Sequence, residues 1–345
     1  MSERNDLLAS IAATIAPYRA GSITRPTPAH VDRWVSQFTP VNQLPFLREF
    51  NHVIGKTFLK WELVQGFLDN LIGNPKLAGT DPKNYWARAN VLQIQKAGGS
   101  QREMVKQFGV ALKSKLGLDL AACGAADGDY IYLDDVLFTG SRIQADLADW
   151  IANTAPAQAT VHVILMAYHM LGEFYTKKNL NAAIAKSGKK IKVTFWRLVE
   201  CENRKIHKNS SDVLWPAVVP ADAAVQAYVP SVKFPLEPRA PGGTYKFFSS
   251  EAGRQILETE FLIAGVKIRG LSGGLSDWYR PLGCGNFGVG FGSLIVTYRN
   301  CPNNCPLALW WGDPQAGGAL DWYPLLPRET NAARAIRDAF SVITD

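Results

Sequence analysis

The sequence predicts an α/β protein with a mainly parallel sheet, an N-terminal helical cap and a C-terminal α+β extension. Between about residues 81 and 200, short apolar runs alternate with segments of helical periodicity. That alternation is typical of βαβ units and a parallel sheet. Amphipathic helical segments precede this core, and a stretch rich in proline and glycine follows it. We therefore expect three regions, residues 1–80, 81–200 and 201–345.

Composition and charge narrow the class of protein. The chain has 345 residues, 47% of them hydrophobic, and no apolar stretch reaches the ~18 residues of a membrane span. Acids precede the first apolar segment, unlike a signal peptide. The five cysteines are an odd number, which argues against a disulfide framework. We expect a cytoplasmic protein without a membrane partner, whose net charge of +7 favours anionic ligands such as nucleotides or nucleic acid.

The N-terminal region is expected to contain two long helical stretches. Thr27 and Pro28 form a cap and first-turn pair, and apolar residues then recur at helical spacing to Phe38. A second helical stretch is expected from Phe46 to about Ile72, before Gly73.

In the central region, strands are expected to alternate with helices. The predicted strands cover residues 90–95, 130–133, 160–169 and 191–199, and the predicted helices cover 101–116, 174–185 and a segment after Gly140. Ligands in such sheets bind at the carboxyl ends of strands. The C-terminal region is expected to contain a helix from Ser250 to about Leu262 that ends before Gly265, a strand over 293–298 and a helix over 331–342.

The most informative stretch runs from Tyr130 to Arg142. An apolar run ends at the paired acids Asp134 and Asp135, and a Thr-Gly-Ser turn over 139–141 then leads into a helix. The first turn of such a helix offers backbone N–H groups and a positive dipole end to an anion. The two acids suit hydroxyls or a divalent cation instead. A ribose 5-phosphate is the simplest ligand that fits both halves.

This arrangement resembles the signature of the type I phosphoribosyltransferases. The resemblance implies that Asp134 and Asp135 hold ribose hydroxyls, directly or through Mg²⁺. It also implies that Thr139, Gly140 and Ser141 bind the 5-phosphate of phosphoribosyl diphosphate. The other interpretation is an acidic turn in an ordinary βα unit.

Two positions depart from the family pattern. Phe138 stands where a small residue is usual and would crowd the phosphate loop. Arg142 stands where a hydroxyl residue is usual, and its charge would replace the lost hydrogen bond.

An earlier strand–turn–helix unit supplies further candidates. In the resembled family a loop of this kind receives the pyrophosphate, and the residues implied for that role are Lys96, Gly98, Gly99, Ser100 and Arg102. A simple serine cap after a glycine turn explains the same residues equally well. His169 and Glu173 follow the next strand and are candidates for bonding a base or carrying a proton. A histidine bonded to local backbone is the alternative.

Two literal motifs in the C-terminal region are not expected to bind ligands. Gly283 to Gly288 matches G-x-G-x-x-G but precedes a strand, so the helix that a dinucleotide site needs is missing. Cys301 and Cys305 lack the second tight cysteine pair of a zinc site, which favours free thiols.

The phrases Trp34–Phe38 and Thr297–Trp310 resemble the phosphoribosyltransferase-like proteins of prokaryotic conflict (anti-phage) systems. This resemblance implies a role in defence, with a protein or nucleic-acid partner.

Only about 35 residues separate Gly99 from Asp134, whereas family enzymes usually place two strands and a hood loop in that interval.

Three hypotheses follow. The first is a phosphoribosyltransferase that transfers or cleaves at the ribose C1 position. The second is a catalytically inactive nucleotide sensor that binds a partner. The third is an unrelated βα protein with an acidic turn.

Overall fold

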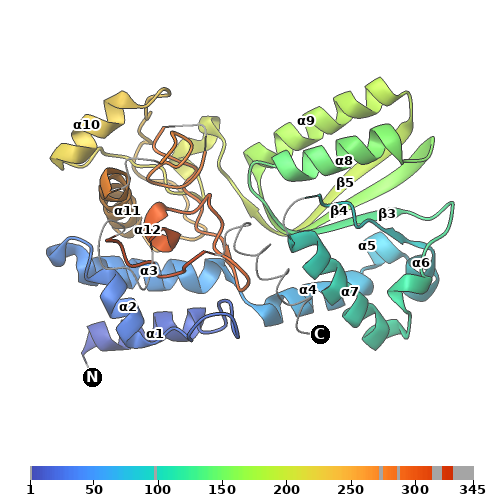
Figure 1. Ribbon diagram of the computed structural model, residues 1–345, viewed down its shortest axis with the longest axis horizontal. Coiled ribbons are helices and arrows are strands. Elements are labelled where there is room, and N and C mark those ends of the chain that lie inside the picture. The colour runs from blue at the N-terminus through green and yellow to red at the C-terminus, as the bar shows by residue number, and fades with distance from the viewer. Residues whose placement is uncertain (1, 97–98, 272–274, 286–287, 313–320, 329–345) are drawn as a thin grey trace, which may run out of the picture. The chain divides into compact units, whose positions relative to one another are not determined.

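A computed structural model describes residues 2–96, 99–271, 275–285, 288–312 and 321–328 (Figure 1). The chain divides into two compact units. One unit contains residues 61–202, and the other combines residues 1–60 with the chain from 203 onwards. The predicted α/β class with parallel sheets is confirmed.

The unit over residues 61–202 is built on a four-stranded parallel sheet with the order β2-β3-β4-β5. Its strands are β2 (Asn90–Val91), β3 (Tyr130–Leu137), β4 (Gln158–His169) and β5 (Lys190–Cys201). Its helices are α4 (Trp61–Ile72), α5 (Pro75–Ala78), α6 (Pro82–Arg88), α7 (Ser100–Leu116), η2 (Leu120–Ala122), α8 (Ser141–Asn153) and α9 (Met170–Ser187).

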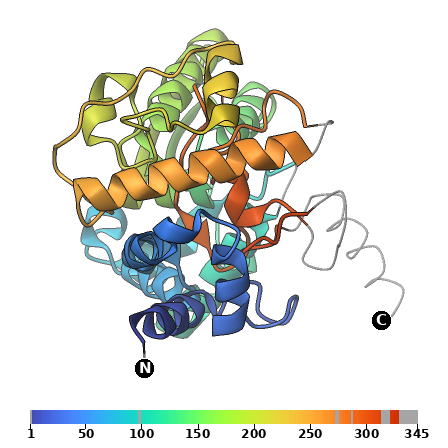
Figure 2. The same cartoon turned by 90° about the vertical axis from the view of Figure 1, so that its left-hand side faces the viewer.

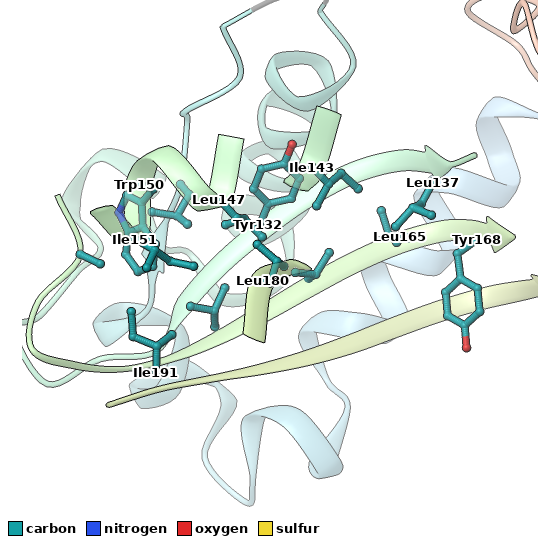
Figure 3. Packing of buried hydrophobic residues seen from close by; sticks show 14 residues of the cluster. Tyr132, Leu137, Ile143, Leu147, Trp150, Ile151, Leu165, Tyr168, Leu180 and Ile191 are labelled. Atoms are coloured by element: carbon teal, nitrogen blue, oxygen red, sulfur yellow. The ribbon is translucent and has the colours of Figure 1, made fainter. Parts of the chain in front are cut away.

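The helices cover both faces of this sheet. Figure 1 shows α8 and α9 on one face and α7 on the other. Buried side chains of β3, β4 and β5 interlock with those of α8 and α9 in one apolar cluster (Figure 3). The labelled members from the two helices are Ile143, Leu147, Trp150, Ile151 and Leu180. Burial of this surface supplies the main driving force for folding the unit.

Two predicted strands of this unit have other limits in the structure. The strand expected over 90–95 ends at Val91. Beyond it, the Gln101 side-chain oxygen accepts the backbone N–H groups of Ile94 and Gln95 at 2.8 Å each, in place of a neighbouring strand. The strand expected to stop at the acidic pair continues to Leu137, because pairing with β4 extends past the acids.

Most regular elements in the described part of the second unit are helices, joined by long irregular segments. Its elements are α1 (Glu3–Ile15), α2 (Pro28–Val35), η1 (Pro40–Asn42), α3 (Gln43–Thr57), β1 (Phe58–Leu59), η3 (Lys205–Ser210), α10 (Ala223–Ser231), α11 (Glu251–Leu271), β6 (Val296–Thr297) and α12 (Leu307–Trp310). Long α11 packs on α3 (Figure 2). Aromatic rings fill the contact around Trp34, whose centroid lies 4.9 Å from that of Phe50 and 6.4 Å from that of Phe261.

Two segments of the chain that were expected to be continuous are interrupted or shortened. The helical stretch expected over 46–72 breaks at β1, because Phe58 and Leu59 pair in parallel with Val296 and Thr297 of β6. The strand expected over 293–298 is limited to that two-residue pairing. Both changes come from one long-range contact that local periodicity does not contain.

The expected end of α11 before Gly265 is also wrong, since the helix continues to Leu271. A side chain at Gly265 would lie 2.5 Å from the Pro281 Cα atom, so the residue is glycine because of close packing. Gly270 in the same helix has open space around it.

Gly265→Ala is expected to lower the free energy of unfolding by about 2–4 kcal/mol, because the added methyl group overlaps backbone atoms. Gly270→Ala is the matched control and should stabilise the protein by up to about 1 kcal/mol through helix propensity. Denaturant unfolding of both variants measures the difference. Equal effects would refute the packing explanation.

Three sequence expectations on smaller features remain. The five cysteines are free thiols, as expected, and Cys201, Cys284, Cys301 and Cys305 are buried. The helix expected over 331–342 lies outside the described residues. No helix in the described part of the chain is long and apolar enough to cross a membrane.

Candidate functional site

The acidic pair lies near the carboxyl end of β3. Asp134 is buried, and its carboxylate accepts the backbone N–H of Asp135 at 2.9 Å. The Ser100 side chain, at the start of α7, also bonds this carboxylate. Asp135 is partly exposed, and its own carboxylate accepts the backbone N–H of Val136 at 2.7 Å. The strand therefore carries one buried and one accessible acid.

The environment of Asp134 opposes its ionisation. Burial raises the pKa of this carboxyl, the neighbouring Asp135 charge raises it further, and the pKa reaches about 7. The Ser100 hydrogen bond and the Arg142 charge act in the opposite direction. A cation placed beside the two acids would favour the ionised form, since it would offset the repulsion between them. This local electrostatic arrangement is typical of a functional site.

The turn after β3 forms an anion-binding geometry. Gly140 is the N-cap of α8 with a φ of 78°, and glycine offers no side chain to accept the first-turn N–H groups. Thr139 Oγ1 and Ser141 Oγ lie 3.1 Å apart, and both residues are exposed. First-turn backbone N–H groups, two hydroxyls and the positive end of a 13-residue helix thus lie together, an arrangement that could bind one phosphate in place of the bonds within the turn.

Helix α9 fixes this turn by close backbone contact. A side chain at Gly140 would lie 1.8 Å from Thr176 Oγ1, and one at Gly172 would lie 1.9 Å from the Phe138 carbonyl oxygen. Thr176 is buried and donates its hydroxyl to the Gly172 carbonyl at 2.7 Å. Two glycines and one threonine therefore set where the turn over 139–141 lies. Sequence analysis did not identify Gly172 and Thr176, whose role depends on a contact between α9 and the turn.

Arg142 brings a positive charge to the acidic pair. The residue is exposed, and its charge lowers the pKa of Asp134. The buried Tyr132 hydroxyl donates to Asp146 Oδ2 at 3.0 Å and links β3 to α8. The guanidinium of Arg142 could therefore bind a phosphate and at the same time interact electrostatically with the carboxylates.

A pair of glutamines holds the loop before α7. Gln101 is fully buried and its side chain accepts from the backbone of the loop, while its own N–H donates to Gln95 Oε1 at 3.2 Å. Gln95 Nε2 donates to Ser100 Oγ at 3.1 Å. These bonds fix Ser100 beside Asp134. Gln101 was not among the sequence candidates, and its position at the start of a helix gave no signal of this role.

The other candidates from this loop are placed differently. Lys96 Nζ lies 3.0 Å from Asp149 of α8, and both side chains are largely exposed. Gly99 is the N-cap of α7, and Arg102 is exposed in its first turn. Gly98 lies outside the described residues.

His169 and Glu173 lie at the junction of β4 and α9. His169 is fully buried, its Nδ1 lies 3.1 Å from the Leu137 carbonyl oxygen, and its ring stacks on Phe138 at 5.0 Å. Burial lowers the pKa of His169 to about 4, so the ring is neutral at pH 7. Glu173 forms an ion pair with Lys177. The histidine thus contacts both the strand end and the turn.

The structure therefore brings four of the predicted residues together: Ser100, Asp134, Asp135 and Arg142. The turn over 139–141 follows the acids closely in the chain. Comparison with known proteins gives one result, a match of the family model PRTase-CE to residues 31–328. The chain belongs to the PRTase-CE family. No curated protein and no solved structure matches it.

The PRTase-CE match covers the candidate site. It spans most of the chain and includes residues of both compact units. The family is phosphoribosyltransferase-like, and the acidic strand end and following turn lie inside the matched range.

The carboxylates of this PRTase-CE chain suit Mg²⁺ only together with a ligand. Mg²⁺ prefers oxygen donors and commonly uses one or two carboxylates plus substrate phosphates. Within the described ranges, no group of three or more His, Cys, Asp or Glu side chains could hold a metal. Asp134 and Asp135 are therefore a partial set that fits a cation carried in by a phosphate ligand.

Proposed function

We propose that the protein binds phosphoribosyl diphosphate or a nucleotide, with Mg²⁺, at the carboxyl end of β3. One observation carries this proposal: Asp134, next to Asp135, bonds the Ser100 hydroxyl and is influenced by the Arg142 charge, directly before the glycine-capped start of α8. Asp134 and Asp135 would bind the ribose hydroxyls, and the turn over 139–141 would bind the 5-phosphate. Mg²⁺, when bound, would neutralise phosphate charge next to the two carboxylates.

The favoured reaction is transfer or cleavage at the ribose C1 position. Breaking the bond at C1 develops positive charge on the ribose ring, and two nearby carboxylates stabilise that charge. Residues 139–142 would hold the other end of the ribose, which fixes the orientation of C1. The loop that Gln95 and Gln101 hold would receive the leaving pyrophosphate, with Gly99, Ser100 and Arg102 nearest to it in the chain.

A second candidate function is nucleotide sensing without chemistry. Between α7 and β3, where family enzymes usually have a hood, the described chain contains only η2 and connecting segments. A site without that cover exposes its ligand to water, which favours binding over group transfer. In this version the bound nucleotide controls a protein or nucleic-acid partner. The resemblance to conflict-system proteins supports placing either function in anti-phage defence.

The deciding experiment is calorimetric titration with phosphoribosyl diphosphate and Mg²⁺ between pH 5.5 and 8.5, with pyrophosphate release followed in the same samples. Below its pKa of about 7 the Asp134 carboxyl is neutral, so a cation must displace its proton. Binding is therefore expected to tighten as pH rises through 7 and then level off. Proton release should be largest below pH 7.

Each result of this titration has a separate meaning. Binding with pyrophosphate release supports the enzyme, and binding without release supports the sensor. A pH-independent affinity would contradict the role given to Asp134. If neither phosphoribosyl diphosphate nor a nucleoside monophosphate binds, the proposed ligand class is wrong.

A further inference from the structure

Four side chains form a hydrogen-bonded chain across the sheet of the unit over residues 61–202. Tyr85 of α6 donates its hydroxyl to Oδ2 of Asp129, the residue before β3, at 3.2 Å. The same oxygen lies 3.2 Å from Nε2 of His162 on β4. The indole Nε1 of Trp196 on β5 donates to His162 Nδ1 at 2.9 Å. The chain therefore connects α6 with β5 through one histidine.

The partners of His162 determine which nitrogen of its ring carries the proton. An indole nitrogen can only donate a hydrogen bond, so Nδ1 of His162 must be the unprotonated acceptor of the Trp196 bond. Nε2 then carries the proton and donates it to Asp129. The ring is held in its neutral form, because a proton on Nδ1 would place two N–H donors against each other.

The surroundings of His162 act on its protonation in two directions. The residue is 9% exposed, and burial lowers the pKa of His162. The Asp129 carboxylate raises this pKa through its hydrogen bond and its charge, whereas the Lys192 charge lowers it. The ring should therefore take up its second proton below pH 6.5, the ordinary pKa of histidine.

Other charged and titratable groups near the chain come from α4, α6, β5 and the segment before β3. These groups line the hollows at its two ends, and they are Glu62, Tyr85, Arg88, Asp127 and Arg197. Arg88 forms an ion pair with Asp127, and Arg197 forms one with Glu200. Asp129 is thus the acid that a charged His162 would face directly.

Trp196, at the far end of the chain, lies in a groove between β5 and α4. Trp196 and Leu198 line this groove of about 380 Å³ together with Leu63 and Phe67 of α4. Trp196 is partly exposed, so a released indole N–H can bond water instead. We propose that His162 is a proton-sensitive switch, and that protonation of its Nδ1 breaks the bond to Trp196 and frees the indole in this groove.

The switching step is a simple protonation. One N–H bond forms on Nδ1 with a proton from the solvent, and the positive charge of the ring pairs with the Asp129 carboxylate. The Trp196 N–H exchanges its histidine partner for water. Raising the pH removes the proton and restores the bond, so the step is reversible.

The proton and the indole compete for the same nitrogen, so each must weaken the binding of the other. Trp196→Phe removes the competitor and should raise the pKa of His162, with a proton affinity about threefold or more higher. Asp129→Asn removes the charge that favours the protonated ring and should lower this pKa. A general loosening of the fold would instead raise the pKa in both variants, because burial lowers it.

The first test is a ¹⁵N NMR titration of the full-length protein between pH 8 and pH 4.5, with labelled histidine and tryptophan. In the neutral protein, Nδ1 of His162 should carry no proton. The Trp196 Nε1–H signal, identified by its loss in Trp196→Phe, should move to the position of an indole bonded to water. Its midpoint should equal that of the His162 ring nitrogens.

The second test repeats this titration on the variants. Leu198→Ala is the matched control for Trp196→Phe, because it opens the same groove without removing the bond. Asp127→Asn is the matched control for Asp129→Asn, an exposed acid two residues away that pairs with Arg88. Both controls should leave the His162 midpoint nearly unchanged. Circular dichroism at each pH checks that every variant is folded.

Three results would overturn the proposal. They are a proton on Nδ1 in the neutral protein, a Trp196 signal that stays constant while His162 titrates, and a His162 that does not titrate before acid unfolds the protein. All three are read from the unchanged protein, so the test stands even where a variant fails to fold. The proposal does not depend on ligand binding, so failure of the proposed function would not affect it.

Discussion

Asp135→Asn is expected to lower the affinity for phosphoribosyl diphosphate with Mg²⁺ by about 100-fold or more and to abolish any pyrophosphate release. Asp135 is the accessible member of the acidic pair, so it is the carboxylate that a ribose hydroxyl or a ligand-bound cation would meet first. Asparagine has nearly the same shape and keeps an oxygen that can accept the Val136 N–H. The loss would therefore be one of charge.

The folded state should tolerate this change. Removing the Asp135 charge relieves the repulsion that raises the pKa of Asp134, so the variant should unfold at an unchanged or slightly higher denaturant concentration. Asp69→Asn in α4 is a suitable control, because Asp69 is also partly exposed and pairs with Lys115. Calorimetry and a pyrophosphate assay compare the unchanged protein with the Asp135→Asn and Asp69→Asn variants. Full binding and turnover by Asp135→Asn would eliminate the proposed role.

Gly140→Ala is expected to cost about 2–4 kcal/mol of unfolding free energy and to prevent phosphate binding. The backbone at Gly140 has a φ of 78°, which alone costs alanine about 1–2 kcal/mol. The new methyl group would also lie 1.8 Å from Thr176 Oγ1. Thr176 is buried and hydrogen-bonded, so it cannot turn away without losing that bond. The turn would have to move off α9, and its N–H groups would move with it.

The variant Gly188→Ala separates the cost of backbone strain from the cost of the steric clash with Thr176. Gly188 has a φ of 69° at the end of α9, and no atom lies within 4 Å of an added side chain. Its replacement should cost only the backbone strain of about 1–2 kcal/mol. Combining Gly140→Ala with Thr176→Ala should recover part of the stability, because the obstructing hydroxyl is gone. Denaturant unfolding and calorimetry measure both effects; equal losses in the two single variants would disprove the steric explanation.

The fold of the central unit was largely predictable from sequence. The strands β4 and β5 and the helices α7 and α9 have nearly their predicted limits, because alternation of buried strands with amphipathic helices is a local pattern. The N-cap of α2 could also be predicted from the sequence, and Thr27 Oγ1 does accept the His30 N–H at 3.3 Å. The break of the expected helix at β1 could not be predicted from the sequence, because it depends on pairing with a strand more than 200 residues later.

In the candidate site, too, local features could be predicted from the sequence, whereas contacts between distant segments could not. A single run of sequence contains the acidic pair and the glycine-capped helix start, so the sequence alone could predict that a candidate hydroxyl or cation site lies beside a candidate anion site. The bond from Ser100 to Asp134 joins two separate βα units. The stacking of His169 on Phe138 likewise depends on a contact between the end of β4 and the segment that follows β3. These relations follow from the packing of the sheet.

The sequence by itself determined the α/β class, the parallel order of strand and helix, and the acid–turn–helix segment with its implied ligand class. These features repeat at short spacing, so neighbouring residues suffice to specify them. The tertiary structure decided which acid is buried, which residues fix the turn after β3, and where long elements break. Each of those outcomes depends on the free energy of a contact between distant segments, which exists only after the chain has packed.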